Sequence, residues 1–275
     1  MITQFHLTSY PETHRILDRG PEYMYILPNP ALLSYVSNYT ITYPKEIMSE
    51  NYTVLPHASG TLLVEYHANS LRGILYGPAT KPDIVGYNPA EMLVIIELQP
   101  AGLFAFTGIC QNEITDVLFP LELVDSTLCK QLFNIIEEAD SVFQLVENFD
   151  QLLLQNLRKP LHPQLGLTFR HVIDHGGNVA VRTLANDICY SERQLNRIFQ
   201  QYVGTNVKTF AKLVRMNNAC RLLQHSSRNI EQISELAGFH DPSHFVHDFQ
   251  AICGITPHNF RENMSDFYNE IAKFG

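Results

Sequence analysis

Two segments in the C-terminal half carry the same pattern of apolar residues. They are "LANDICYSERQLNRIFQQYVGTNVKTF" (184–210) and "ISELAGFHDPSHFVHDFQAICGITPHNF" (233–260). The matched pairs are Leu184 with Ile233, Ile188 with Ala237, Tyr190 with Phe239, Leu195 with Phe245, Phe199 with Phe249, Gly204 with Gly254 and Phe210 with Phe260. The offset between the copies changes by one residue inside a turn, where a loop can absorb it. The repeat therefore predicts two copies of one small helical unit.

Each copy carries the start and stop signals of a short helix, a tight turn and a longer second helix. Ser191 is the predicted N-cap of the second helix in the first copy. Asp241 followed by Pro242 provides an N-cap and a first helical residue in the second copy. Gly204 and Gly254 stand where each second helix must end. This arrangement is a helix-turn-helix, written twice.

A single helix is predicted between the copies. The segment "TNVKTFAKLVRMNNACRLLQHS" (205–226) has no internal Gly or Pro, and Thr205 is its expected cap. A helix of roughly 20 residues is about 30 Å long, which is close to the ~34 Å of one DNA turn. Such a rod can present two helices to successive major grooves from one chain.

The N-terminal half has a different pattern. Residues 1 to about 120 alternate short apolar runs with turn residues, which predicts strands. Three- and four-residue spacing in "STLCKQLFNIIEEA" and "SVFQLVENFDQLLLQNL" predicts two amphipathic helices. The segment "RKPLHPQLG" (158–166), with two prolines, is the expected linker. We therefore predict an α+β domain over residues 1–160 and an all-α domain with two helix-turn-helix motifs over residues 161–275.

Residues 175–262 resemble the DNA-binding domain of the AraC/XylS family of transcription regulators. The resemblance is carried by "LNRIF", "RMNNACRLL", "GFHDPSHFVHDF" and "GITPHNFR". The front half more loosely resembles the N-terminal domain of some members, a cupin-like strand bundle followed by helices. The resemblance implies sequence-specific binding to double-stranded DNA, with a front domain that senses an effector or dimerises. Cys189 stands where the family usually has Gly, which predicts backbone strain in the first turn.

The repeat and the resemblance together select candidate DNA contacts. On the second helices, polar residues lie outside the buried stripe, and Arg and Asn side chains can bond guanine and adenine edges as a fork. The predicted base contacts are Arg193, Asn196, Arg197, Ser243, His244 and His247. The predicted phosphate contacts are Arg182, Lys208, Lys212, Arg228 and Arg261. Arg215 is predicted to be structural, tying the rod to its neighbours.

No metal or cofactor site is predicted. His240, His244 and His247 have the spacing of one helical face, but Asp241 and Pro242 should start the helix after His240. Zinc would then lack a third ligand. His57 and His67 lack the spacing of a metal-binding cupin. Four aromatic residues could line an effector pocket or equally pack in the core: Tyr52, Tyr66, Tyr76 and Phe104.

Charge and cysteine content narrow the functional classes. The chain has a net charge of −9, but residues from 165 onward carry about +1, so only the back half suits a polyanion. The 5 cysteines are scattered, which favours reduced thiols in a cytoplasm. No signal peptide, membrane span or membrane partner is expected. RNA polymerase, a small-molecule effector and a second copy of the chain are candidate partners beside DNA. An enzyme or a protein-interaction module built on the strand bundle is the alternative, although no catalytic motif stands out.

Overall fold

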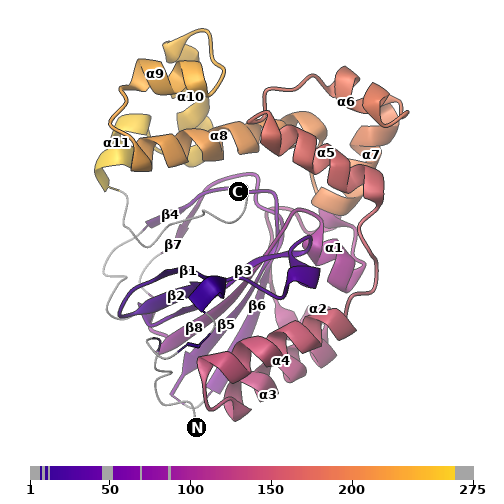
Figure 1. Ribbon diagram of the computed structural model, residues 1–275, viewed down its shortest axis with the longest axis vertical. Helices are drawn as coiled ribbons and strands as arrows, with labels where there is room; N and C mark the ends of the chain where they lie inside the picture. Colours follow the sequence, from indigo (N-terminus) through magenta and orange to yellow (C-terminus); the bar gives the residue numbers. More distant parts are fainter. Residues whose placement is uncertain are drawn as a thin grey trace.

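The computed structural model describes residues 7, 10–11, 13–44, 52–68, 70–85 and 88–263. An antiparallel sheet and covering helices make up the N-terminal part, and the C-terminal part is helical (Figure 1). This confirms the predicted fold class. In the described ranges, no helix is both long enough and apolar enough to span a membrane.

The N-terminal part is built on one large sheet. Within the described ranges, a 7-stranded sheet has the order β1-β2-β3-β8-β5-β6-β9, and β4 pairs with β7 in a second, 2-stranded sheet. The strands of the two sheets are β1 (Ile16–Arg19), β2 (Tyr23–Ile26), β3 (Val36–Thr42), β4 (Tyr52–Val54), β5 (Thr61–His67), β6 (Ser70–Tyr76), β7 (Asp83–Val85), β8 (Met92–Leu98) and β9 (Leu118–Pro120). All pairings are antiparallel, so short turns can connect consecutive strands such as β5 and β6.

Helices α3 (Ser126–Glu138) and α4 (Val142–Gln155) confirm the two predicted amphipathic helices. They lie beside the large sheet (Figure 1). Their apolar stripes join one face of β8 in a single core, in which Met92, Val94 and Phe149 are at most 2% exposed. Their N-caps are Asp125 and Ser141, whose side chains accept hydrogen bonds from backbone N–H groups of the first turn.

Sequence patterns missed the short helices α1 (Gly102–Thr107) and α2 (Leu121–Val124). Gly102 is the first residue of α1. A Cβ at this position would lie 2.2 Å from the backbone oxygen of Tyr35, so glycine permits the close approach of the two segments. The need for glycine at residue 102 comes from a tertiary contact, and such a contact cannot be predicted from the local spacing of apolar residues.

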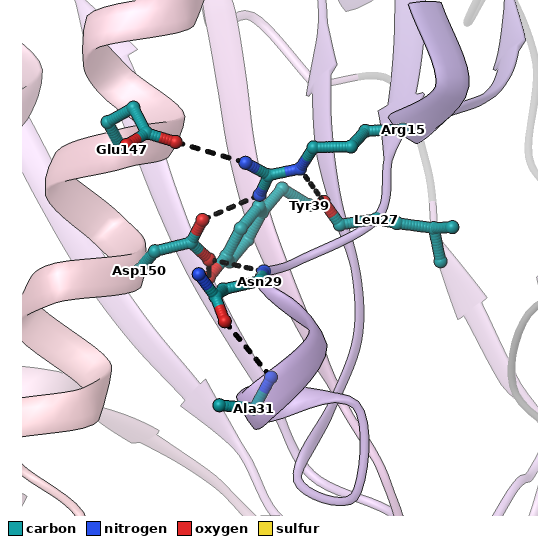
Figure 2. Close-up of polar contacts among 7 residues, drawn as sticks. All are labelled: Arg15, Leu27, Asn29, Ala31, Tyr39, Glu147 and Asp150. Atoms are coloured by element: carbon teal, nitrogen blue, oxygen red, sulfur yellow. Dashed lines mark hydrogen bonds and ion pairs between the residues drawn. The ribbon is translucent and has the colours of Figure 1, made fainter. Parts of the chain in front are cut away.

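A buried polar cluster joins α4 to the sheet (Figure 2). The Arg15 guanidinium donates to Asp150 at 2.6 Å, to Glu147 at 3.1 Å and to the Leu27 carbonyl at 2.9 Å. Asp150 also accepts the Tyr39 hydroxyl at 2.8 Å and the Asn29 backbone N–H at 2.9 Å. Burial, with the negative charge of Asp150, raises the pKa of Tyr39 well above its usual value. The hydroxyl therefore stays protonated and can donate.

The C-terminal part begins at α5 (Pro163–Asp174), inside the predicted linker. The linker prediction was therefore too long at its C-terminal end, because Pro163 is the first residue of a helix. The remaining helices are α6 (Val181–Asp187), α7 (Glu192–Val203), α8 (Val207–His225), α9 (Ile230–Leu236), α10 (Pro242–Cys253) and α11 (Pro257–Asn263). Their core contains Phe169, Phe199 and Phe249, and it also includes Leu55 and Ala101 from the N-terminal part.

Candidate nucleic-acid interface

The two predicted helix-turn-helix motifs are present with their predicted caps. Ser191 accepts a hydrogen bond from the backbone N–H of Gln194 at 3.1 Å and starts α7. Asp241 accepts from the backbone N–H of Ser243 at 2.9 Å and starts α10, with Pro242 as the first helical residue. Gly204 and Gly254 end these helices in the left-handed conformation, with φ of 82° and 77°. The motifs are therefore α6–α7 and α9–α10.

One helix connects the motifs. Helix α8 has 19 residues, which gives it a length of about 28 Å, and both α7 and α10 pack beside it (Figure 1). Its N-cap is Asn206, which accepts from the backbone N–H of Thr209 at 2.8 Å. The prediction of Thr205 as the cap was wrong by one residue, and the Thr205 side chain is instead buried. The predicted single rod is otherwise confirmed.

The second helices of both motifs bury the same positions. Leu195 and Phe199 of α7 are at most 1% exposed, as are Phe245 and Phe249 of α10. The residues between them alternate between exposed and half-buried in the same order in both copies. Five of the six predicted base-contacting residues lie on the exposed faces: Arg193, Arg197, Ser243, His244 and His247. The described residues of the N-terminal part do not cover either exposed face.

Asn196 differs from its prediction. Its side chain is half-buried, and its oxygen accepts from the backbone N–H of Val207 at 3.1 Å. Its amide nitrogen donates to the carbonyl of Glu192 at 3.0 Å. The expectation of an outward amide was wrong. The first N–H of α8 has no partner within its own helix, and it donates to the Asn196 side-chain oxygen instead. Asn196 ties α7 to the start of α8.

The turns of the two motifs use different residues for the same conformation. Cys189 has φ of 59°, and Gly238, which lies 49 residues later, has φ of 77°. The predicted strain at Cys189 is therefore confirmed, because a side chain in the left-handed region is unfavourable.

We expect Cys189→Gly to raise the free energy of unfolding by up to about 1 kcal/mol, since glycine removes the strain but gains entropy in the unfolded chain. The opposite exchange, Gly238→Cys, should destabilise, because a Cβ there would lie 2.3 Å from the Asn178 side chain. Denaturant unfolding of the full chain measures both. A destabilising Cys189→Gly would contradict this account.

The predicted phosphate contacts fall into two groups. Arg182, Lys208 and Arg228 have exposed side chains. Lys212 instead pairs with Asp248 at 3.0 Å, and Arg261 donates to the carbonyl of Arg228 at 2.6 Å. Both side chains therefore have a partner within the domain, and Arg261 is exposed as well, so contact of either residue with phosphate stays a prediction.

Arg215 has the predicted structural role. It donates to the carbonyl of Gly177 at 3.3 Å, and its guanidinium lies over the Phe239 ring at 5.2 Å from the centroid. Burial lowers the pKa of Arg215, and the negative charge of Asp248 opposes this shift. The residue ties α8 to the turn of the second motif.

The three clustered histidines do not share one helical face. His240 precedes α10, as predicted, whereas His244 and His247 lie on its exposed side. The Asp248 carboxylate is 3.8 Å from His244 Nε2 and 4.0 Å from His247 Nδ1. Among the described residues, no three His, Cys, Asp or Glu side chains are grouped closely enough to hold a metal ion.

Comparison with known proteins identifies the family to which this domain is similar. A helix-turn-helix domain model matches residues 184–263, and a model for a domain of unknown function matches residues 24–120. The chain is 26% identical over 132 residues to the arabinose operon regulatory protein of Escherichia coli K12 (45% of each chain). It is 35% identical over 78 residues to the transcriptional regulator ArgR of Pseudomonas aeruginosa (28% of this chain, 24% of that one). The chain belongs to the AraC/XylS family.

The chain matches less than half the length of these two relatives. A solved transcriptional regulator with an AraC-type DNA-binding domain, from Chromobacterium violaceum, aligns with a TM-score of 0.35 at 31% identity, over 36% of this chain and 90% of that one.

In this AraC/XylS protein, the N-terminal part contacts the end of the first motif and the middle of α8, which sequence reasoning missed. The Thr115 hydroxyl donates to the carbonyl of Gly204 at 3.0 Å, at the end of α7. The Phe104 and Tyr202 rings lie 4.2 Å apart between centroids. Midway along α8, Asn217 donates to the Pro56 carbonyl at 3.2 Å. Of the four aromatic pocket candidates, Phe104 therefore packs at this junction.

The other three aromatic candidates have separate surroundings. Tyr66 packs against the main N-terminal core and Tyr76 against a smaller cluster around Leu63. The side chain of Tyr52 lies outside the described residues. His57 is buried and contacts the Ser59 hydroxyl at 2.8 Å. His67 lies 3.3 Å from the Glu65 carboxylate.

Proposed function

We propose that the chain is a sequence-specific DNA-binding transcription regulator that inserts α7 and α10 into successive major grooves. One observation carries the proposal: two exposed helix faces of identical burial pattern are joined by one helix of about 28 Å. That length is close to the ~34 Å between successive major grooves on one side of DNA. Membership of the AraC/XylS family supports the same function.

The proposed contacts follow from which side chains are exposed. Arg193, Arg197, Ser243, His244 and His247 are the proposed base contacts. Arg182, Lys208 and Arg228, which are exposed on the same domain, are the proposed phosphate contacts. We propose residues 1–160 as the sensing or dimerising domain and 161–275 as the DNA-binding domain. The contacts of Thr115 and Phe104 with the end of α7 give the first domain a route to influence the second.

A small-molecule effector, RNA polymerase and a second copy of the chain are proposed partners of this regulator, acting in the cytoplasm. In the described part of the chain, we find nothing that favours the enzyme alternative.

Selection of binding sites by the full chain tests the proposed function. The protein is incubated with a library of duplex DNA of random sequence, and the bound DNA is amplified and sequenced. We expect two conserved blocks about one helical turn apart, with binding that weakens steeply as salt rises. Enrichment of no sequence by folded protein at low salt would contradict sequence-specific binding.

DNA binding should respond to pH through the exposed histidines of α10. Imidazole changes charge between pH 5 and 8, and neighbouring phosphates favour its protonated form. Affinity should therefore rise as pH falls from about 8 to 6, by roughly 1.5- to 5-fold for each imidazolium that gains the ~0.2–1 kcal/mol of an exposed ion pair. His247→Ala should flatten the trend in a fluorescence titration, and Ser243→Ala is the control that should keep it.

The competing explanation for these histidines is a zinc site. Stoichiometric zinc in the purified protein, lost on replacement of His244 or His247, would contradict the DNA-contact assignment.

A further inference from the structure

The two second helices are attached to α8 by different polar contacts. Helix α7 is tied through Asn196, whose oxygen accepts the N–H of Val207 at the first residue of α8. Helix α10 is tied through Asp248, whose carboxylate lies 3.0 Å from Lys212 Nζ. Each of these two contacts occurs in only one copy of the repeat. Val246 stands at the position of Asn196, and Ile198 stands at the position of Asp248.

Asp248 is well placed to restrain α10. Its side chain is 15% exposed, against 39% for Lys212, so the carboxylate is largely removed from water. A carboxylate in this environment needs a close cation, and Lys212 provides it from the facing helix. His244 and His247 approach the same carboxylate at 3.8 and 4.0 Å, but both belong to α10 and cannot hold that helix against another.

We propose that the Lys212–Asp248 ion pair is a positioning contact that sets the orientation of α10 on α8, and thereby the spacing between the two DNA blocks that the chain accepts. The inference rests on the proposed function. It assigns Lys212 a role in choosing the spacing of the operator in place of a phosphate contact.

The spacing of the blocks is a sensitive measure of this orientation. One additional base pair moves the second block by about 3.4 Å along the DNA axis and rotates it by roughly 35°. A firmly held pair of helices cannot follow both changes without losing contacts at one block. A loosened α10 can follow them in part, so an ion pair that positions α10 should narrow the accepted spacing.

The test applies the random-library selection to full-length variants. Wild-type protein should select one spacing, whereas Lys212→Met and Asp248→Asn should select the same two blocks over at least two spacings. Lys208→Met, about one turn earlier on α8, is the matched control. It should weaken binding without changing the spacing, because Lys208 is an exposed phosphate candidate. Thermal melts establish that each variant is folded.

The exchanged pair, Lys212→Asp with Asp248→Lys, keeps the tie with reversed polarity and should restore a single spacing. It also serves as the test if either single variant fails to fold. A single unchanged spacing in folded Lys212→Met and Asp248→Asn would overturn the positioning role while leaving the proposed function intact. Broadened spacing in the exchanged pair would overturn it as well. Absence of any enriched sequence with wild-type protein would instead overturn the proposed function, and this inference with it.

Discussion

Replacing Arg15 with methionine is expected to lower the free energy of unfolding by about 3–5 kcal/mol, because it leaves the Asp150 carboxylate buried without its cation. The Arg15 and Asp150 side chains are 9% and 5% exposed. Asp150 would keep the Tyr39 hydroxyl and the Asn29 N–H, which satisfy its lone pairs but do not neutralise its charge. Denaturant unfolding of the full chain, followed by circular dichroism, measures the loss.

Two variants separate the buried charge from the loss of a contact. Arg158 forms an ion pair with Asp125 at the same distance of 2.6 Å, but its side chain is 49% exposed. Arg158→Met should therefore cost no more than about 1 kcal/mol. Asp150→Asn removes the charge while keeping an oxygen acceptor, so Arg15→Met should cost at least about 1 kcal/mol less in that background. Equal losses for Arg15→Met and Arg158→Met would refute the charge-burial explanation.

The features predicted correctly from sequence are those in which cause and effect lie a few residues apart. Ser191 caps the helix that begins at the next residue, and Asp241 with Pro242 does the same for α10. The apolar spacing of α3 and α4 records which face of each helix is buried. Strain at Cys189 was predicted because the AraC/XylS family usually has Gly at this position, and the structure gives the residue a left-handed backbone that Gly238 adopts without strain in the second copy.

The contacts that sequence patterns did not predict join residues that are remote in sequence. Lys212 and Arg261 carry the positive charge expected of phosphate contacts. Lys212 also pairs with Asp248, 36 residues away, and Arg261 donates to the Arg228 carbonyl, 33 residues away. Asn196 is outward by helical periodicity, yet it satisfies the start of the next helix. Arg15 and Asp150 are separated by 135 residues, and neither residue belongs to a recognisable motif. These contacts depend on how the elements pack, which periodicity does not encode.

Replacing Arg197 with alanine is expected to relax the sequence preference of the chain at one position of its operator. Arg197 is exposed on α7, one turn after Arg193, and no longer shares the predicted role with Asn196, whose amide is engaged at Val207. A guanidinium that bonds guanine O6 and N7 contributes about 1–3 kcal/mol of discrimination against other bases. We therefore expect a loss of roughly 5- to 150-fold on the preferred sequence and almost none on sequences altered at that base.

Arg197→Lys distinguishes base contact from phosphate contact. Lysine keeps the positive charge but lacks the planar fork, so it can replace a phosphate contact and cannot reproduce a bidentate contact with guanine. If Arg197 contacts a base, both variants should lose preference at the same operator position in competition binding against all four bases. If it contacts phosphate, Arg197→Lys should bind nearly as wild type, and Arg197→Ala should weaken every sequence equally. Because the corresponding position of α10 holds His247, only the block contacted by α7 should change in either variant.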